Sequence, residues 1–449
     1  MMTDQPRPPN TRVFVQPVSK QQAAKTWERT KGRAHAGRVE AARRIITARE
    51  TGKRLAPLVR QFLRGNAVRF SAVLRALPDD ADQQTAQQLE AITDPWKATY
   101  EHISWHNKRK ATGGTRPVCA LPPDLKAAHY MIADALKAQF TPRAHIYGVT
   151  GKSRDDAARD LKDAQNAGLN YLAKLDIVDC FQSINPDSLY QLPLPKEVIR
   201  RALDTRNMRF EEKEPGTGTT HSQRLSGIPT HIQSESGPRG LLQGSPTSSI
   251  ILAWFLNELP TPEDVRVFIF ADNFSVAARD PITCRETVES LVAYFVRDCP
   301  AGPLNLCPAV YAGQGTEPFD FLSYEFDPDK SGIGIAASAL SKLEGRLADL
   351  EDDDALDDLT FALATWQELR GFRSGFSAAE EVDAQLESYV KLAGFWLDRR
   401  QNAFLSNLHA HVFDSPGTTE GAVIARLLQR YRSPRDRNKN CMKTGKAAK

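Results

Sequence analysis

Two aspartates, Asp176 and Asp272, each follow a short apolar segment of the kind that forms a buried strand. The first lies in LAKLDIVDCFQSI and the second in VFIFADNFSV. Carboxylates on rigid strand ends suit two-metal phosphoryl transfer, in which two Mg²⁺ ions about 4 Å apart contact a triphosphate and a 3′-hydroxyl. Mg²⁺ commonly takes one or two protein carboxylates and completes its shell with phosphate oxygens and water. Either aspartate alone could merely cap a turn, but the pair is chemically sufficient for such a site.

A second segment, GLLQGSPTSSIILAWFLN at residues 240–257, joins a turn to a helix. Gln243 and Gly244 predict a turn whose backbone can approach a ligand closely. Ser245 is expected to be the N-cap of the helix and Pro246 its first residue. This is the most specific string in the chain.

In order and spacing, these segments resemble the motifs of the reverse transcriptase family, above all the bacterial group II intron-like and defence-associated enzymes. The resemblance extends over roughly residues 105–330 and includes GGTRPVCALP and IYGVTGKSRDDA. It implies that Arg116 contacts the triphosphate of the incoming nucleotide, because a planar guanidinium pairs two phosphate oxygens at once. An exposed hairpin charge is the alternative for Arg116. Lys152 stands where the family commonly has arginine, and it would also belong to the nucleotide site.

The resemblance assigns roles around the first aspartate. Asp176 would be a ligand of both metal ions and the carbonyl oxygen of Ile177 a further ligand. Asp179 would lie near the sugar or the triphosphate. Phe181 falls at the steric-gate position, where an aromatic ring would exclude a ribose 2′-hydroxyl and favour deoxynucleotides. On periodicity alone, a core aromatic is the better interpretation of Phe181.

The other motifs depart from the family pattern in places. FADN stands where the family has Tyr-Xaa-Asp-Asp, so Asp272 is retained as a catalytic metal ligand while Asn273 contributes an uncharged amide. Gln243 and Gly244 would shape the nucleotide pocket, although Leu242 replaces the usual proline before them. The altered box predicts a functional but divergent site.

The segment that closes the palm in this family corresponds to residues 304–326. Within it, Phe321, Leu322 and Tyr324 would form the turn that grips the primer end, with Ser323 in place of glycine. Many relatives carry a lysine just upstream that protonates the leaving pyrophosphate. No lysine stands in that region here, so the general acid is unassigned.

The elements that must position these residues follow from local patterns. Alternation and β-branched or aromatic content predict strands that end at Asp176 and Asp272, and a basic hairpin around residues 106–120. Helical patterns are expected over residues 19–65, 66–105 with a break near Pro78, 123–139, 154–168, 196–210, 246–258 and 337–432. The predicted helices around residues 364–372 and 389–400 mix aromatic and basic side chains, which suits contact with a duplex backbone and suits a plain amphipathic bundle almost equally well.

The resemblance predicts an α+β fold of the right-hand polymerase type, with fingers, an antiparallel palm sheet, a helical thumb and an N-terminal helical extension. The expected boundaries are 1–105 for the basic N-terminal extension, 106–170 for the fingers, 171–335 for the palm with an insertion around 196–240, 336–432 for the thumb and 433–449 for a basic tail.

Charge is distributed unevenly along the chain. Residues 1–60 hold 14 Lys and Arg against 4 Asp and Glu, whereas the net charge of all 449 residues is only +4. Residues 426–449 are also strongly basic, so the middle is acidic. Basic flanks that hold phosphates around a centre that holds cations would explain this pattern, and solvated basic tails would explain it equally well.

Cysteine usage and hydropathy bear on the compartment. The 6 cysteines form no C-x-x-C pair and no zinc-like spacing with histidine, and the opening residues are polar rather than an apolar signal core. No apolar run approaches the roughly 20 residues of a membrane-spanning helix. We expect a reduced, cytoplasmic protein without structural disulfides or a membrane partner.

These inferences together predict an RNA-directed DNA polymerase that uses two Mg²⁺ ions, with Mn²⁺ as an alternative. Its expected partners are dNTPs, a DNA product, a non-coding RNA as template or scaffold, and a second protein subunit or another copy of the chain. A role in bacterial antiviral defence, with atypical priming or template use, follows from the resemblance alone. The alternatives are an inactive RNA-binding scaffold and a group II intron-type maturase. An RNA-dependent RNA polymerase is less favoured, because Phe181 should exclude ribonucleotides.

Overall fold

The computed structural model describes residues 20–97, 103–109, 115–149, 151–213, 220–221, 233–234, 237–238, 240–312, 318–327, 330–351, 358–380, 382–384, 386–387 and 389. The chain divides into two compact units. Unit 1 comprises Met1–Arg143, Val178–Glu258 and Phe295–Leu304, and unit 2 comprises Ala144–Ile177, Leu259–Tyr294 and Asn305–Lys449. The chain therefore passes from unit 2 to unit 1 directly after the first aspartate motif begins, and each unit is described by itself.

Unit 1 is mainly helical. Its α-helices are α1 (Lys20–Glu50), α2 (Ala56–Arg64), α3 (Asn66–Ala76), α4 (Gln83–Ile92), α5 (Pro123–Gln139), α7 (Cys180–Ser183), α8 (Lys196–Val198) and α9 (Ser248–Leu256). Three further short helices are η1 (Pro186–Gln191), η2 (Ile199–Leu203) and η3 (Thr205–Asn207), of which η2 is a π-helix. The long helix expected over residues 19–65 is interrupted at Thr51 and Gly52, where Gly52 adopts a φ of 66° that favours glycine.

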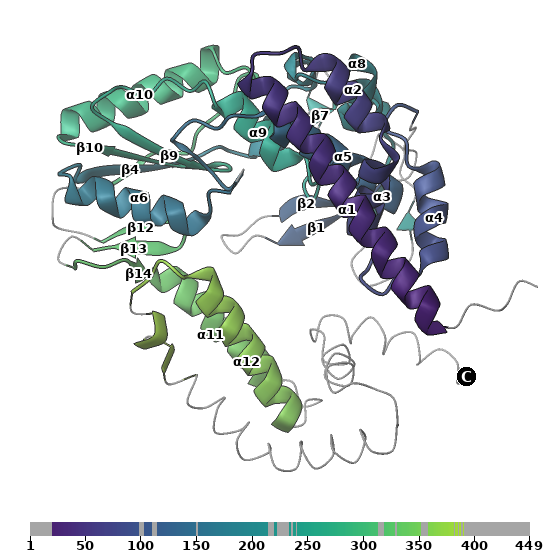
Figure 1. Ribbon diagram of the computed structural model, residues 1–449. Helices are drawn as coiled ribbons and strands as arrows, with labels where there is room; N and C mark the ends of the chain where they lie inside the picture. Colours follow the sequence, from purple (N-terminus) through teal and green to yellow (C-terminus); the bar gives the residue numbers. More distant parts are fainter. Residues whose placement is uncertain are drawn as a thin grey trace, which may run out of the picture. The chain divides into compact units, whose positions relative to one another are not determined.

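The N-terminal helices pack as a layer on α5. Figure 1 shows α1 running along α3 and α5, and Ala34, Ile45 and Ala48 of α1 are buried. A Cβ atom on Gly37 would lie 2.6 Å from the Cβ atom of Ala67, so only glycine permits this close helix crossing. The predicted N-terminal helical extension is therefore present as a packed layer.

The buried carboxylate of Asp134 forms ion pairs with two of these helices. Asp134 on α5, with a side chain only 9% exposed, lies 3.3 Å from Arg38 of α1 and 2.5 Å from Arg75 of α3. The Arg75 guanidinium also stacks 4.5 Å from the ring centroid of Tyr130. Because a carboxylate out of water needs charged partners, this one residue links three helices.

Unit 1 also holds a small sheet in the order β2-β1-β5-β6. Its strands are β1 (Ile103–Arg109), β2 (Thr115–Ala120), β5 (Phe210–Lys213) and β6 (Thr220–His221), and a separate pair consists of β7 (Gln233–Ser234) and β8 (Gly237–Pro238). β1 and β2 are antiparallel, as predicted for the basic hairpin, whereas β1 and β5 are parallel. Ile103, Trp105, Leu125, Phe210 and Leu242 form the core beneath this sheet.

Unit 2 contains the larger sheet, in the order β11-β4-β10-β9-β3. Its strands are β3 (Ile146–Tyr147), β4 (Tyr171–Asp176), β9 (Arg266–Phe270), β10 (Asn273–Ala278) and β11 (Val310–Ala312). Figure 1 shows α6 (Arg154–Asn166) and α10 (Pro281–Arg297) on opposite sides of this sheet. The pairings among β4, β9, β10 and β11 are antiparallel, as expected for the palm sheet. The edge strand β3, from the segment assigned to the fingers, runs parallel to β9.

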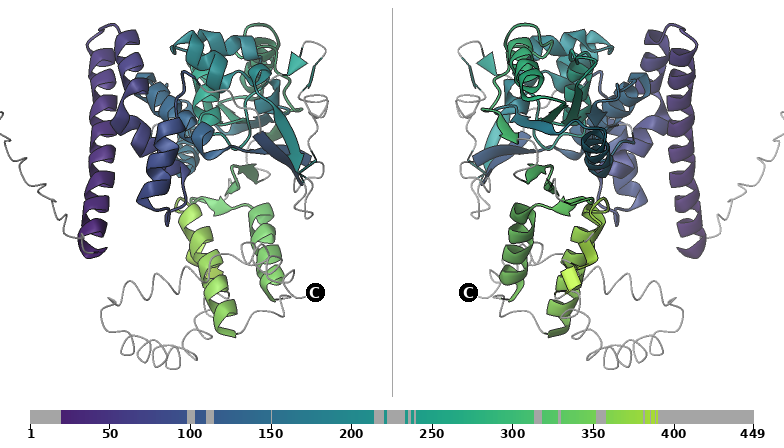
Figure 2. Two further views of the ribbon diagram at one scale, coloured as in Figure 1. Left: turned by 90° about the vertical axis from the view of Figure 1, so that its right-hand side faces the viewer. Right: turned by 90° about the vertical axis from the view of Figure 1, so that its left-hand side faces the viewer.

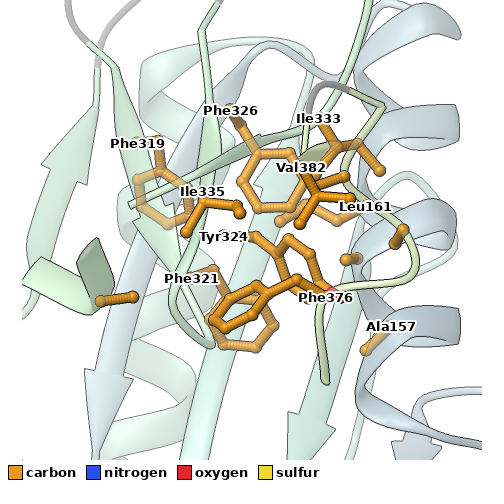
Figure 3. Close-up of a cluster of buried hydrophobic side chains, with 14 of the residues drawn as sticks. Ala157, Leu161, Phe319, Phe321, Tyr324, Phe326, Ile333, Ile335, Phe376 and Val382 are labelled. Carbon is orange, nitrogen blue, oxygen red and sulfur yellow. The ribbon is translucent and has the colours of Figure 1, made fainter. Parts of the chain in front are cut away.

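A second, three-stranded sheet of unit 2 leads into a pair of helices. Its strands β12 (Phe319–Phe321), β13 (Tyr324–Phe326) and β14 (Gly334–Ile335) are all antiparallel. Their apolar side chains meet those of α6 and the segment after α12 in one buried cluster (Figure 3). The helices α11 (Ala337–Glu351) and α12 (Asp358–Gly375) lie side by side (Figures 1 and 2), as the expected helical thumb requires. Residues 390–432 of that thumb and the tail at 433–449 lie outside the described residues.

None of the helices in the described ranges combines the length and the hydropathy that a bilayer span requires. The cysteines within these ranges, Cys119, Cys180, Cys284, Cys299 and Cys307, are free thiols.

The Asp134 cluster yields a stability prediction. Replacing Asp134 with Ala removes the buried carboxylate that pairs with both Arg38 and Arg75, so the free energy of unfolding should fall by about 3 kcal/mol. Chemical denaturation followed by circular dichroism measures the change. Glu28→Ala is the matched control, because Glu28 is 68% exposed in its pair with Lys31 and should matter far less. Equal losses for the two variants would contradict this account.

Candidate active site

The two predicted aspartates meet at one edge of the unit 2 sheet. β4 and β10 pair so that Asp176 lies opposite Asn273, and β9 pairs with β10 so that Phe270 also lies opposite Asn273. Directly beyond this register, the backbone N–H of Ile177 donates to the backbone oxygen of Asp272 at 3.2 Å. The sheet register thus places Asp176 and Asp272 on neighbouring strand ends.

The backbone of Asp176 is held from the other side as well. The N–H of Cys307 donates to the backbone oxygen of Asp176 at 2.8 Å, and Ile177 forms a β-bridge with Leu306. The Ile177 side chain is buried. The start of the motif therefore sits between two flanking segments, which fixes the direction in which the Asp176 carboxylate leaves the strand.

Asn273 contacts the neighbouring carboxylate. Its side-chain Nδ2 donates to Oδ1 of Asp272 at 3.0 Å. An aspartate at position 273 could not donate this hydrogen bond and would add a like charge. In this chain the amide therefore orients the Asp272 carboxylate.

The side chains of Asp176, Asp272 and Asn273 offer oxygen donors for a divalent cation, and they are accessible to solvent. Asp176 is exposed, and Asp272 and Asn273 are half-exposed, so the oxygens face away from the core. The described residues contain no cluster of three or more His, Cys, Asp or Glu that could hold a metal ion. Two carboxylates meet the requirement of Mg²⁺ when substrate phosphates supply further oxygens, so the donor set fits a substrate-assisted site and not an all-protein cage.

Backbone strain gathers on the predicted motifs. Among the described residues other than glycine, those with positive φ are Asp179 at 44°, Ala271 at 54°, Leu322 at 53° and Ser323 at 68°. Each belongs to a segment singled out from the sequence. Left-handed backbone disfavours residues with a Cβ atom, and such strain concentrates where function requires a fixed geometry.

In unit 1, the glycine-rich turn lies against the backbone of Phe181. The N–H of Leu241 donates to the backbone oxygen of Phe181 at 2.5 Å. Gly240 has a φ of 102°, and a Cβ atom there would lie 2.4 Å from the same oxygen. The Phe181 side chain is half-buried. This burial is compatible both with a core aromatic and with a steric gate.

The same turn also contacts β2. The N–H of Cys119 donates to the backbone oxygen of Gln243 at 2.9 Å. Gly244 has a φ of 98°, and a Cβ atom there would lie 2.8 Å from the backbone oxygen of Cys119. Arg116 belongs to β2, opposite Lys108 on β1. Unit 1 thus brings together Phe181, the Gln243 turn and the strand that carries Arg116.

The positions of Asp179 and Lys152 do not by themselves indicate a nucleotide contact. Asp179 is exposed at the N-cap of α7. In unit 2, Nζ of Lys152 donates to the backbone oxygen of Ala144 at 2.9 Å and lies 4.7 Å from the ring centroid of Tyr147. Lys152 also lines a cavity of about 400 Å³ together with Arg266. Its ammonium group therefore has local partners in addition to any ligand.

The predicted primer-grip residues divide into two groups. Phe321 and Tyr324 are buried in the cluster of Figure 3, at 1% and 0% exposure. Leu322 and Ser323 form the half-exposed tip of the turn between β12 and β13. Only the tip could touch a primer, while the two aromatic residues anchor it.

Tyr324 is anchored by Asp155, a residue that the sequence motifs do not indicate. The Tyr324 hydroxyl donates to Oδ1 of Asp155 at 2.6 Å, and burial together with this carboxylate raises the pKa of Tyr324. Asp155 lies in the first turn of α6, where acidic residues are common for helical reasons, so no spacing signal distinguishes it.

The expected helix start at Ser245 and Pro246 is wrong. α9 begins at Ser248, and Thr247 occupies the N-cap position. The Oγ atom of Ser245 still accepts the backbone N–H of Thr247 at 3.1 Å. The turn is therefore longer than predicted, and the backbone oxygen of Ser245 accepts the N–H of Ser248 across it at 3.4 Å.

Residues 107–298 match the family model described as "Reverse transcriptase (RNA-dependent DNA polymerase)". This part of the chain is a reverse transcriptase domain, and the prediction of a right-hand polymerase fold is confirmed by it. The narrower assignment to group II intron-like or defence-associated enzymes stays a prediction. The search of curated proteins found no match.

The similar solved structures include telomerases of two Candida species. A truncated apo telomerase from Candida tropicalis has 12% identity and a TM-score of 0.34, covering 53% of this chain and 56% of that one. Telomerase from Candida albicans, in complex with a TWJ fragment of telomeric RNA, has 13% identity and a TM-score of 0.33, covering 66% and 56%. Another apo structure from Candida tropicalis has 13% identity and a TM-score of 0.34, covering 68% and 58%. The aligned part spans a little over half the length of these telomerases.

The strained turn before Asp272 generates a prediction. Ala271→Val places a β-branched residue at positive φ and should lower the free energy of unfolding by about 1–2 kcal/mol. Ala271→Gly is the matched control. Its free energy of unfolding should fall by at most about 0.5 kcal/mol, because relief of the backbone strain offsets the added entropy of the unfolded chain. Thermal and urea denaturation measure both. A valine variant as stable as the glycine variant would show that the turn is not strained.

Proposed function

Because residues 107–298 form a reverse transcriptase domain, we propose that this protein is an active RNA-directed DNA polymerase that joins dNTPs to a 3′-hydroxyl. The observation that carries the proposal is the pairing of Asp176 and Asp272 on neighbouring strand ends, joined through the 3.2 Å bond from Ile177 N–H to the Asp272 backbone oxygen. A structural role alone would not require two carboxylates at the exposed edge of a sheet.

The residues of unit 2 would hold two Mg²⁺ ions, or Mn²⁺ as an alternative. When bound, such ions neutralise the triphosphate and stabilise the attacking and leaving oxygens. Asp176 would bind both ions, and the Ile177 carbonyl oxygen and Asp272 would complete the protein ligands. Asn273 would orient the Asp272 carboxylate through its amide and bring one negative charge fewer than an aspartate. A reduced metal affinity or rate is therefore part of the proposal.

The residues of unit 1 would recognise the nucleotide. Arg116 would pair with its phosphate oxygens, and Asp179 would lie near its sugar or triphosphate. Gln243 and Gly244 would shape the floor of the pocket, and Phe181 would exclude a 2′-hydroxyl. The contacts of the turn with Cys119 and with the Phe181 backbone support a shared pocket for these residues. Lys152 of unit 2 would supply a further cation for the phosphates.

The primer end would contact the tip of the β12–β13 turn. Leu322 and Ser323 form this tip, and Phe321 and Tyr324 would hold it in place from the core. The helices beyond residue 336 would act as the thumb. The domain boundaries given from the sequence remain part of this proposal.

The basic outer surface of the N-terminal helices supports an RNA partner. The exposed cationic side chains on α1, on α2 and between them are Lys25, Arg29, Arg33, Arg43, Arg44, Lys53, Arg54, Arg60 and Arg64. Such a surface binds phosphate backbones independently of sequence. We propose a non-coding RNA as template or scaffold, a cytoplasmic location, and a role in antiviral defence in which a second subunit or another copy of the chain takes part.

An RNA-binding scaffold without polymerase activity is the second candidate. The uncharged Asn273 next to Asp272 and the absence of a lysine at residues 307–310 favour it. The two candidates differ in one respect that can be measured, namely DNA synthesis that depends on Asp176.

Activity is tested with the purified protein and its co-purifying nucleic acid. We expect incorporation of labelled dNTPs in the presence of Mg²⁺, and a loss of at least about 100-fold in Asp176→Asn and Asp272→Asn, because each removes a charged ligand. Glu258→Gln, an exposed carboxylate of unit 1, is the matched control. Sequencing of the product identifies the template. No product from the wild type, or equal product from Asp176→Asn, would contradict the proposal.

Sugar selection is tested at Phe181. Replacing Phe181 with Ala should raise the ratio of ribonucleotide to deoxynucleotide incorporation by at least about tenfold, because the ring no longer excludes the 2′-hydroxyl. Single-nucleotide extension with matched NTP and dNTP measures the ratio. Phe295→Leu, which changes a fully buried aromatic, should leave it unchanged. An unchanged ratio in the Phe181 variant would assign this residue to the core.

A further inference from the structure

A buried histidine contacts the glycine-rich turn. His129 lies on α5 with only 2% of its surface exposed. Its Nδ1 atom is 2.6 Å from Oγ of Ser245, and its Nε2 atom is 2.6 Å from the backbone oxygen of Ala202. Ser245 directly follows Gln243 and Gly244, so the imidazole links this turn to η2, which contains Ala202.

The donors and acceptors in this chain of hydrogen bonds can be assigned. A carbonyl oxygen only accepts, so the proton lies on Nε2 and is donated to Ala202. Burial lowers the pKa of His129 to about 4, so near neutral pH the ring is uncharged and carries a single N–H. Nδ1 is therefore an acceptor, and the Ser245 hydroxyl must donate to it.

The donor in the hydrogen bond between Ser245 and Thr247 can then be assigned as well. Oγ of Ser245 lies 2.7 Å from Oγ1 of Thr247. Because the Ser245 proton is given to His129, the Thr247 hydroxyl is the donor in this pair. Ser245 also accepts the N–H of Thr247, and its own N–H donates to the Leu242 oxygen at 3.1 Å. Oγ of Ser245 therefore donates to His129 and accepts from Thr247, which leaves its side chain a single orientation.

The contact between His129 and Ala202 explains why a histidine is needed at this position. η2 is a π-helix that ends at Leu203, and the last carbonyl groups of a helix lack partners within it. His129 supplies the missing donor to Ala202 and at the same time an acceptor to Ser245. No other uncharged side chain offers a donor and an acceptor at these two positions on a rigid ring.

We propose that His129 is a positioning residue of the nucleotide pocket, which acts through Ser245 to fix the Gln243–Gly244 turn against β2. The inference rests on the proposed polymerase function and assigns a role in it to a residue that does not touch the substrate. Gln243 and Gly244 are already held by Cys119 on one side of the turn. Ser245 and His129 secure the other side, so both ends of the turn are fixed before a nucleotide binds.

A nucleophilic Ser–His pair does not account for this arrangement. A general base must exchange protons with a substrate or leaving group, whereas only 2% of the His129 surface is exposed. The geometry therefore serves orientation rather than proton transfer.

The first test uses Ser245 in the full-length protein. Ser245→Ala removes the donor to His129 and should raise the KM for dNTP by about tenfold, the cost of one lost buried hydrogen bond, while kcat changes by less than about threefold. Ser245→Thr keeps the hydroxyl and should restore a KM within about threefold of the wild type. A merely structural role would lower the melting temperature without this separation of KM from kcat.

The second test separates the two ring nitrogens. His129→Asn can keep an acceptor near the position of Nδ1, whereas His129→Gln can keep a donor near that of Nε2. We expect the Asn variant to have the lower KM of the two and the Gln variant to resemble Ser245→Ala. In the double variant of His129→Gln with Ser245→Ala, the KM should be no higher than in Ser245→Ala alone, because both changes remove the same contact. Gln139→Met, a buried polar change on the same helix, is the control.

These measurements distinguish a failure of the proposed polymerase function from a failure of the proposed role of His129. A wild type that makes no DNA overturns the polymerase function and the inference with it. An active wild type whose KM for dNTP is unchanged in Ser245→Ala overturns the inference alone. If the His129 variants do not fold, the Ser245→Ala and Ser245→Thr pair still decides, because Ser245 is half-exposed.

Discussion

The hydrogen bond from the Ile177 N–H to the Asp272 backbone oxygen is the constraint on which the candidate site depends. It continues the β4–β10 pairing by one step beyond the last paired residues, Asp176 and Asn273. A shift of one residue in this register would turn every side chain of the strand to the opposite face. The buried side chains of Leu175 and Phe274 prevent such a shift, so the apolar core of unit 2 determines where the carboxylates lie.

The same logic explains why strain is tolerated beside the site. Ala271, Leu322 and Ser323 hold left-handed backbone in two turns whose flanking strands are buried. The packing of the strands determines the conformation of the turns, and the turns fix the positions of Asp272 and of the tip formed by Leu322 and Ser323. In unit 1, Asp179 also has left-handed backbone, whereas Gly240 and Gly244 adopt positive φ without a Cβ atom. The hydrogen bond between Ser245 and His129 of α5 holds this turn.

Local patterns were sufficient to predict part of the structure. Asp176 and Asp272 were found because strand-like segments end on them, and the basic hairpin and the helix of α5 follow from turn residues and periodicity. The N-cap at Ser245 was predicted wrongly, since α9 begins at Ser248, and the Ser245 hydroxyl contacts His129, which lies 116 positions away in the sequence. The burial of Phe321 and Tyr324 depends in the same way on α6 and Phe376, which meet them only in the folded chain. Long-range partners of this kind leave no local pattern.

In the proposed polymerase, Asp176 and Asp272 together hold two metal ions. Crystals of the protein grown with Mn²⁺ and a dNTP, measured by anomalous diffraction at the manganese edge, test it most directly. The account predicts two peaks about 4 Å apart, with a carboxylate oxygen of Asp176 within bonding distance of both ions and one of Asp272 within bonding distance of at least one. Manganese peaks elsewhere, or a nucleotide bound with no peak beside either aspartate, would contradict it.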